Sequence, residues 1–165
     1  MKLEQIQQEL AQFLTQREVP AVAAWPEGRA QEPEQAVVLV SLEEVKCTSS
    51  GLQDYLGQWA DEPGGEEILR YGRRAQLTFA LDILTPPQAG AAQEREVLDR
   101  LLAALQAQAP LGLRVRELEV EQSEYDTKER LLRRRCRLCC SGWLHARERQ
   151  EDSLLSFELR GEMSR

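Results

Sequence analysis

The stretch Arg73–Leu84, RRAQLTFALDIL, decides the fold. Apolar residues occupy every second position in it, at Ala75, Leu77, Phe79, Leu81 and Ile83. Polar or small residues stand between them, at Gln76, Thr78, Ala80 and Asp82. An alternation with a period of two is typical of a β-strand that buries one face. The stretch therefore predicts a strand in a sheet that packs against a hydrophobic core.

The segments on either side predict a second buried strand and two amphipathic helices. AVVLVSLEEV at 36–45 is apolar on successive residues, which indicates a strand covered on both faces. Near the start of the chain, apolar residues recur at helical spacing at Leu3, Ile6, Leu10, Phe13 and Leu14. The same spacing returns after the first strand at Val97, Leu98, Leu101, Leu102 and Leu105.

The C-terminal third predicts a β-hairpin and a short last strand. GLRVRELEVEQSEY at 112–125 and LLRRRCRLCCSGWLHARE at 131–148 are joined by YDTKE, whose Asp and Thr suit a tight turn. SLLSFELRG at 153–161 can add a strand to the sheet edge. We therefore expect one α+β domain over 1–165, with a mostly antiparallel sheet of four to six strands and two amphipathic helices packed on one face. An irregular insertion interrupts it at about 48–71, where glycines and a proline break the pattern.

Composition limits the classes of function. The 165 residues are 42% hydrophobic and 30% charged, as in a soluble globular protein. With 21 basic and 28 acidic residues the net charge is −7, so the molecule as a whole repels phosphate backbones and anionic membranes. No segment resembles a signal peptide or a membrane span. We expect neither specific nucleic-acid binding nor a membrane role.

The most unusual segment is RLLRRRCRLCC at 130–140, which can be a nucleic-acid patch, a metal knuckle or a strand with two different faces. As a strand it places Arg133, Arg135 and Arg137 on one face, together with Cys139 and Trp143. The other face then holds Leu132, Cys136, Leu138, Cys140 and Leu144. Glu117, Glu119 and Glu121 of the preceding strand are plausible partners for the arginines across the hairpin. Arg134 falls on the apolar face, where it needs a solvated strand end or a snorkelling side chain.

Metal binding and cysteine catalysis find little support. Zinc needs four ligands, yet only Cys136 and Cys139 have the usual spacing, and Cys140 points away from Cys139 on a strand. A cysteine nucleophile needs a base nearby, and His145 is the single histidine. We assign no catalytic, cofactor-binding or metal-binding residue, and we expect no cofactor.

The insertion is apolar enough to bind a partner. Leu56 and Trp59 either wait for a partner surface or form a local mini-core folded back on the sheet. With Arg133, Arg135 and Arg137, they are the residues that we expect at an interface.

The order of AVVLVSLEEV, GLQDYLG, YGRRAQLTFALDIL, the helix over EREVLDRLLAALQAQ and the closing hairpin resembles small virion-assembly proteins of tailed bacteriophages. It is most similar to the tail-terminator and head–tail joining group carried by prophages. The resemblance implies a non-enzymatic structural subunit that forms a ring, commonly a hexamer, with phage tail-tube and neck proteins as partners. It also implies the bacterial cytoplasm during assembly, and the virion when the prophage is active.

Two other classes stay open at this point. The same surfaces can serve a small soluble adaptor or binding protein that forms no ring. The other alternative is a cysteine- or metal-dependent enzyme built around the cluster at 136–140.

Overall fold

The fold of the protein is taken from a computed structural model, which describes residues 3–23, 33–49, 55–60, 67–107, 110–147 and 156–161. Two helices flank a sheet: α1 (Leu3–Thr15) and α2 (Gly90–Ala107). The strands in chain order are β1 (Ala21–Ala23), β2 (Val37–Thr48), β3 (Tyr55–Ala60), β4 (Glu67–Thr85), β5 (Arg114–Asp126), β6 (Leu131–Arg147) and β7 (Ser156–Gly161). A short turn η2 (Pro110–Gly112) precedes β5.

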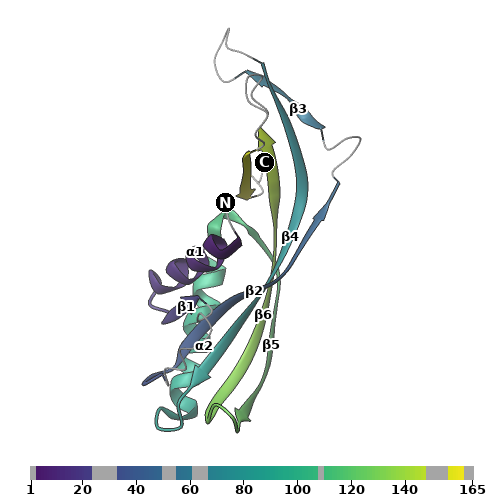
Figure 1. Ribbon diagram of the computed structural model, residues 1–165. Coiled ribbons are helices and arrows are strands. Elements are labelled where there is room, and N and C mark those ends of the chain that lie inside the picture. The colour runs from purple at the N-terminus through teal and green to yellow at the C-terminus, as the bar shows by residue number, and fades with distance from the viewer. Residues whose placement is uncertain are drawn as a thin grey trace.

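All seven strands belong to one sheet, and five of them form its main path in the order β1-β2-β4-β6-β5. Only β1 pairs in parallel, with β2, and the other pairs are antiparallel. The short strands β3 and β7 pair with one end of β4 and of β6 (Figure 1). The predicted α+β class with a mostly antiparallel sheet is confirmed.

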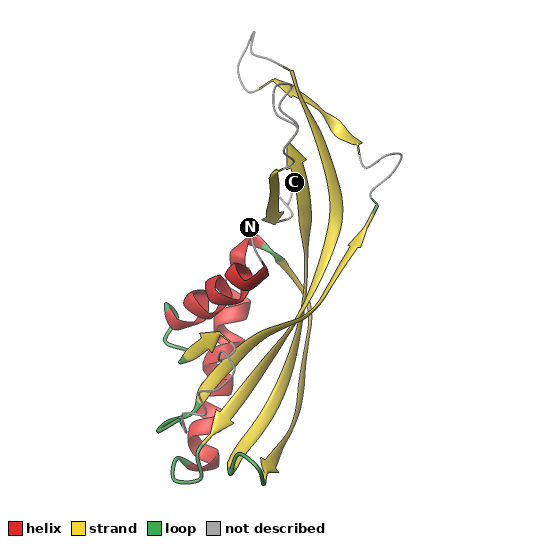
Figure 2. Ribbon diagram, in the orientation of Figure 1, coloured by secondary structure: helices red, strands yellow, loops and turns green. Residues whose placement is uncertain are grey.

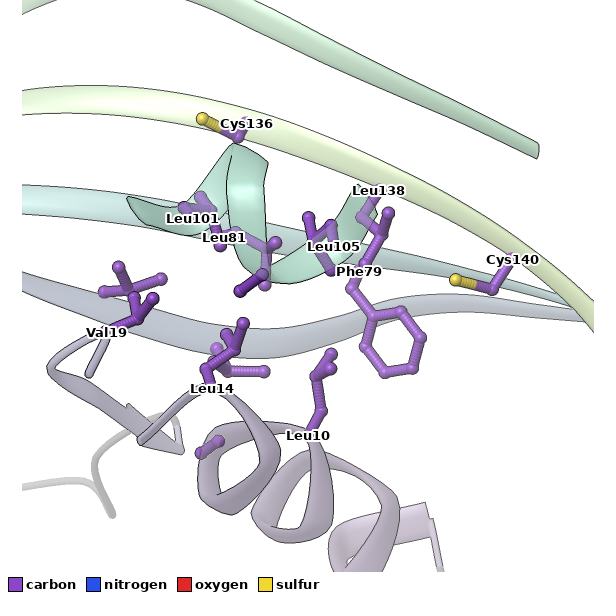
Figure 3. Packing of buried hydrophobic residues seen from close by; sticks show 14 of the residues in the cluster. Leu10, Leu14, Val19, Phe79, Leu81, Leu101, Leu105, Cys136, Leu138 and Cys140 are labelled. Carbon is purple, nitrogen blue, oxygen red and sulfur yellow. The ribbon is translucent and has the colours of Figure 1, made fainter. Parts of the chain in front are cut away.

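Both helices lie on the same side of the sheet (Figure 2). Their apolar stripes meet the alternating residues of the central strands, as the period of the stretch 73–84 predicts. Leu10 and Leu14 of α1 point toward Phe79 and Leu81 of β4 (Figure 3), and all four side chains are fully buried. α2 adds Val97, Leu101 and Leu105, and β6 adds Cys136, Leu138 and Cys140. The expectation of two helices on one face is therefore met.

The helices cover only part of the sheet's length. β4 and β6 continue past them and carry β3 and β7 at their far ends (Figure 1). β2 is exposed from Glu43 onward, where it leaves the helices. The range 48–71, expected as an irregular insertion, contains β3 and the first residues of β4, which pair with each other. Residues 50–54 and 61–66 lie outside the described part of the chain.

The predicted hairpin is confirmed as β5 and β6, joined by residues 127–130. The Oδ1 atom of Asp126 accepts hydrogen bonds from the backbone N–H groups of Lys128 (2.9 Å) and Glu129 (3.2 Å). These two bonds lower the pKa of Asp126 from its ordinary value. The Asp at the start of the turn thus holds the two strands in register.

Candidate functional site

The face of the sheet opposite the helices is the candidate site, because no described element covers it (Figure 2). Arg133, Arg135 and Arg137 of β6 lie on this face, as the strand interpretation predicts. Their register partners on β4 are Leu84, Asp82 and Ala80, which alternate with the buried core positions. We call the three arginines the arginine stripe.

Asp82 sits beneath the arginine stripe with a side chain that is 3% exposed. The Nη2 atom of Arg133 donates a hydrogen bond to Oδ2 of Asp82, and Nε of Arg135 donates one to Oδ1 at 3.2 Å. The hydrogen bond and the charge of Asp82 raise the pKa of Arg135. A carboxylate this deeply buried needs charged partners, and the two guanidinium groups supply them from solvent-facing positions.

Arg137 pairs with Glu43 of β2, with 3.8 Å between Nε and Oε2. Glu43 can reach across β4 because it lies at an irregularity in the β2–β4 register, between Leu42 and Glu44. All three arginines therefore turn toward β4 and β2. Glu119 faces Arg137 across the hairpin, as the sequence predicts. The ion pairs of the arginines, however, are formed with the buried Asp82 and with Glu43.

The glutamates of β5 instead form a separate row beside the arginines. Glu119 is the register partner of Arg137, and Glu124 is that of Arg133. Glu117, which faces Cys139, and Glu121, whose charge raises the pKa of Arg135, complete the row. All four are exposed, and none forms an ion pair within the described part of the chain. We call these four residues the glutamate stripe.

Arg134 points to the helix-covered face and is held there by a buried partner. Its Nε atom donates to Oε1 of Glu94 on α2 at 2.5 Å, and the Oγ atom of Ser123 on β5 donates to Oε2 at 2.7 Å. The Glu94 side chain is 2% exposed and that of Arg134 is 22% exposed. From its place on the apolar face, we expect Arg134 to lie at a solvated strand end or to snorkel to solvent. It does neither, because Glu94 pairs with it on the helix-covered face. A signal was present in the sequence, since Glu94 precedes Val97 and Leu101 on the apolar stripe of the helix.

The cysteines are divided between the two faces of β6. Cys136 and Cys140 are buried in the core, and burial raises the pKa of their thiols to about 11 and about 12. Cys139 lies half-buried on the uncovered face, with its sulfur 3.8 Å from the hydroxyl of Thr78. Cys47 is exposed on β2. Cys136 and Cys139, the pair with zinc-like spacing, therefore lie on opposite faces, and the described residues hold no group of three potential metal ligands.

Two further features were candidates for a site: a surface groove without charged groups in its described lining, and three residues whose side chains are not described. A groove with a volume of about 460 Å³ runs between α1 and β1. Its described lining has amide, hydroxyl and small apolar groups: Gln8, Ala11, Gln12, Thr15, Gln16, Ala21, Val22 and Ala23. Leu56 and Trp59 lie on β3 and His145 lies on β6, but the positions of their side chains are outside the described part.

No protein-family model matches the chain, and no curated protein matches it significantly. Neither described helix combines the length and the apolar character that a membrane span needs.

Proposed function

We propose that this chain is a non-enzymatic structural subunit that self-associates, of the tail-terminator or head–tail joining class of tailed phages and prophages. The observation that supports the proposal best is the form of the sheet. Its strands run past the helices that cover it, and its second face carries no described element. Within the described part of the chain, the outer layer of this face consists of charged side chains, which leaves it available to a partner.

The chemistry of the described residues favours binding over catalysis. The two core thiols have raised pKa values, so at neutral pH they are protonated and make poor nucleophiles. The charged groups of the uncovered face are arginines and carboxylates, which recognise complementary charge. In the phage assignment, which rests on the resemblance in element order, the partners are further copies of the chain and the tail-tube and neck proteins.

Light scattering over a wide range of protein concentration, with negative-stain imaging of any large species, tests the proposal. We expect the mass to rise to that of a closed ring, since subunits with two different complementary surfaces close by rotation. Runs with and without magnesium and reductant control for adventitious metal bridges and disulfides. A monomer at every concentration would remove self-association and leave the soluble adaptor as the better interpretation.

A further inference from the structure

The arginine stripe and the glutamate stripe lie side by side on the uncovered face of the sheet. Along β5 and β6, Glu119 stands level with Arg137, and Glu124 stands level with Arg133. The stripes therefore have matching positions along the strands and differ only in their place across the sheet. A surface with this pattern is complementary to itself.

Pairs within the chain neutralise the arginine stripe only in part, because its three arginines share two carboxylates. The arginines turn toward β4 and β2, where Asp82 and Glu43 receive them. Their side chains nevertheless remain 39% exposed at Arg133 and Arg135 and 46% exposed at Arg137. A guanidinium group has five N–H donors, so each arginine has donors beyond those used in these pairs. The glutamate stripe keeps its acceptors exposed as well.

A two-fold axis parallel to the strands, placed above the face between β5 and β6, exchanges the two stripes. It carries the arginine stripe of one copy over the glutamate stripe of the other without shifting either along the strands. Arg137 of each copy then lies over Glu119 of its partner, and Arg133 lies over Glu124. Two sheets that pack face to face are about 10 Å apart, a gap that facing arginine and glutamate side chains can fill.

The sheet edges are poorer surfaces for self-association than this face. β5 has two irregularities in its pairing with β6, between Val115 and Glu117 and between Val120 and Ser123. β2 has another, followed by charged residues. Bulges and charges of this kind protect edge strands from pairing with another chain. With the axis between β5 and the neighbouring β6, and with β5 at the edge of the sheet, only these two strands of each copy face each other. They span about 300 Å² from ordinary strand rise and spacing, below the roughly 800 Å² per partner of stable complexes, so the contact is a weak one held by charge.

We infer that a second copy of this chain docks on the uncovered sheet face, in a two-fold pair in which the arginine stripe of each copy faces the glutamate stripe of the other. The inference rests on the self-association proposed above and specifies one contact of it. Because a two-fold contact cannot by itself close a ring, any ring uses a different surface. The pair is held by exposed charges, so it weakens as salt is added.

Charge reversal at Arg137 and Glu119 tests the pairing, because neither residue touches the core. Arg137→Glu gives one chain two acidic positions, and Glu119→Arg gives another chain two basic positions. We expect each variant alone to self-associate at least about tenfold more weakly than the wild type, because like charges then face each other. An equimolar mixture should form a mixed pair, visible by native mass spectrometry. The double variant, with both changes in one chain, should pair like the wild type.

The controls separate folding, charge and ring formation. Arg95→Glu, on the exposed side of α2, makes the same change in net charge as Arg137→Glu and should leave pairing intact. Circular dichroism and thermal unfolding identify any variant that fails to fold, and restored pairing in the mixture cannot come from misfolded chains. If the wild type forms rings while neither reversal weakens association, the two-fold pairing is wrong and the assembly proposal stands. If the wild type forms two-fold pairs but no rings, the inferred pairing is supported and the proposed ring assembly is wrong.

Discussion

At the scale of the residue, the buried contact between Glu94 and Arg134 is the feature most sensitive to substitution. Replacing Glu94 by Gln keeps the volume but leaves Arg134, whose side chain is only 22% exposed, without its carboxylate partner. Removal of one partner from a buried pair is costly, and we expect Glu94→Gln to lower the free energy of unfolding by about 3 kcal/mol. Urea-induced unfolding followed by circular dichroism measures this.

Glu96→Gln is the matched control for that experiment. Glu96 pairs with Arg100 one helical turn away at 2.5 Å, but the two side chains are 59% and 46% exposed. An exposed pair of this kind is worth about 0.5 kcal/mol or less. Equal losses for the two variants would show that burial of Glu94 contributes nothing to the strength of its contact.

The two core thiols predict a particular dependence of stability on pH. Cys136 and Cys140 keep their protons in the folded state up to about pH 11 and 12, whereas in the unfolded chain they ionise near pH 9. The stabilising effect of the raised pKa is complete below pH 9 and is lost as the pH rises toward 11 for Cys136 and toward 12 for Cys140. Each thiol then lowers the free energy of unfolding by up to about 1.4 kcal/mol per pH unit.

A Cys136→Ala, Cys140→Ala double variant should lose this additional slope, although its stability at neutral pH is lower because the core then has cavities. Urea unfolding at a series of pH values compares the slopes. Cys47→Ala changes an exposed thiol and should keep the wild-type slope. Identical slopes for the wild type and the double variant would mean that the core thiols ionise as readily in the folded protein as in the unfolded one.

Residue-level predictions from the sequence succeed where they depend on local periodicity. The alternation in RLLRRRCRLCC correctly separates Arg133, Arg135 and Arg137 from Cys136 and Cys140. It cannot reveal the ion-pair partners, because β6 has a neighbour on each side and the sequence indicates only β5, its hairpin partner. Asp82 lies on the other neighbour, β4, about fifty positions earlier in the chain.

At the scale of the element, the sequence predicts the two helices but not β3, the short strand at the far end of the sheet. The helical periodicity around Leu10 and Leu101 predicts α1 and α2 because each helix buries its own stripe. The range 48–71 has no such stripe, and its strand pairs with another strand without a helix to pack against. Glycines and a proline therefore dominate the local pattern, and β3 is not predicted.

The proposed role of β3 can be tested with a Leu56→Ala, Trp59→Ala double variant. If this strand contacts a neighbouring subunit, the variant should stay folded and lose the ring in light scattering, because large apolar residues supply most of the binding energy at interfaces. Unchanged association would exclude β3 from the contact between subunits.

At the scale of the whole molecule, the sheet has one part that packs against the helices and another part that extends beyond them. From Ala75 to Thr85, β4 packs beneath both helices, whereas from Glu67 to Arg74 the described elements that pair with it are strands. Backbone hydrogen bonds without a packed layer over them open with less free energy than those over a core. The two parts of a single strand should therefore differ in protection from hydrogen exchange.

We expect amides from Phe79 to Ile83 to exchange only through global unfolding, since the side chains at both ends of this segment are fully buried under the helices. Amides from Arg70 to Arg74 should exchange through smaller openings. Their protection should increase when the chains associate through β3, which pairs with this part of β4, because a neighbour then packs on it. Native-state hydrogen exchange with peptide-level mass spectrometry, at protein concentrations below and above the onset of association, measures both effects. Uniform protection along β4 at low concentration would show that strand pairing alone stabilises the extension. Protection that is independent of concentration would place the contact between subunits elsewhere on the molecule.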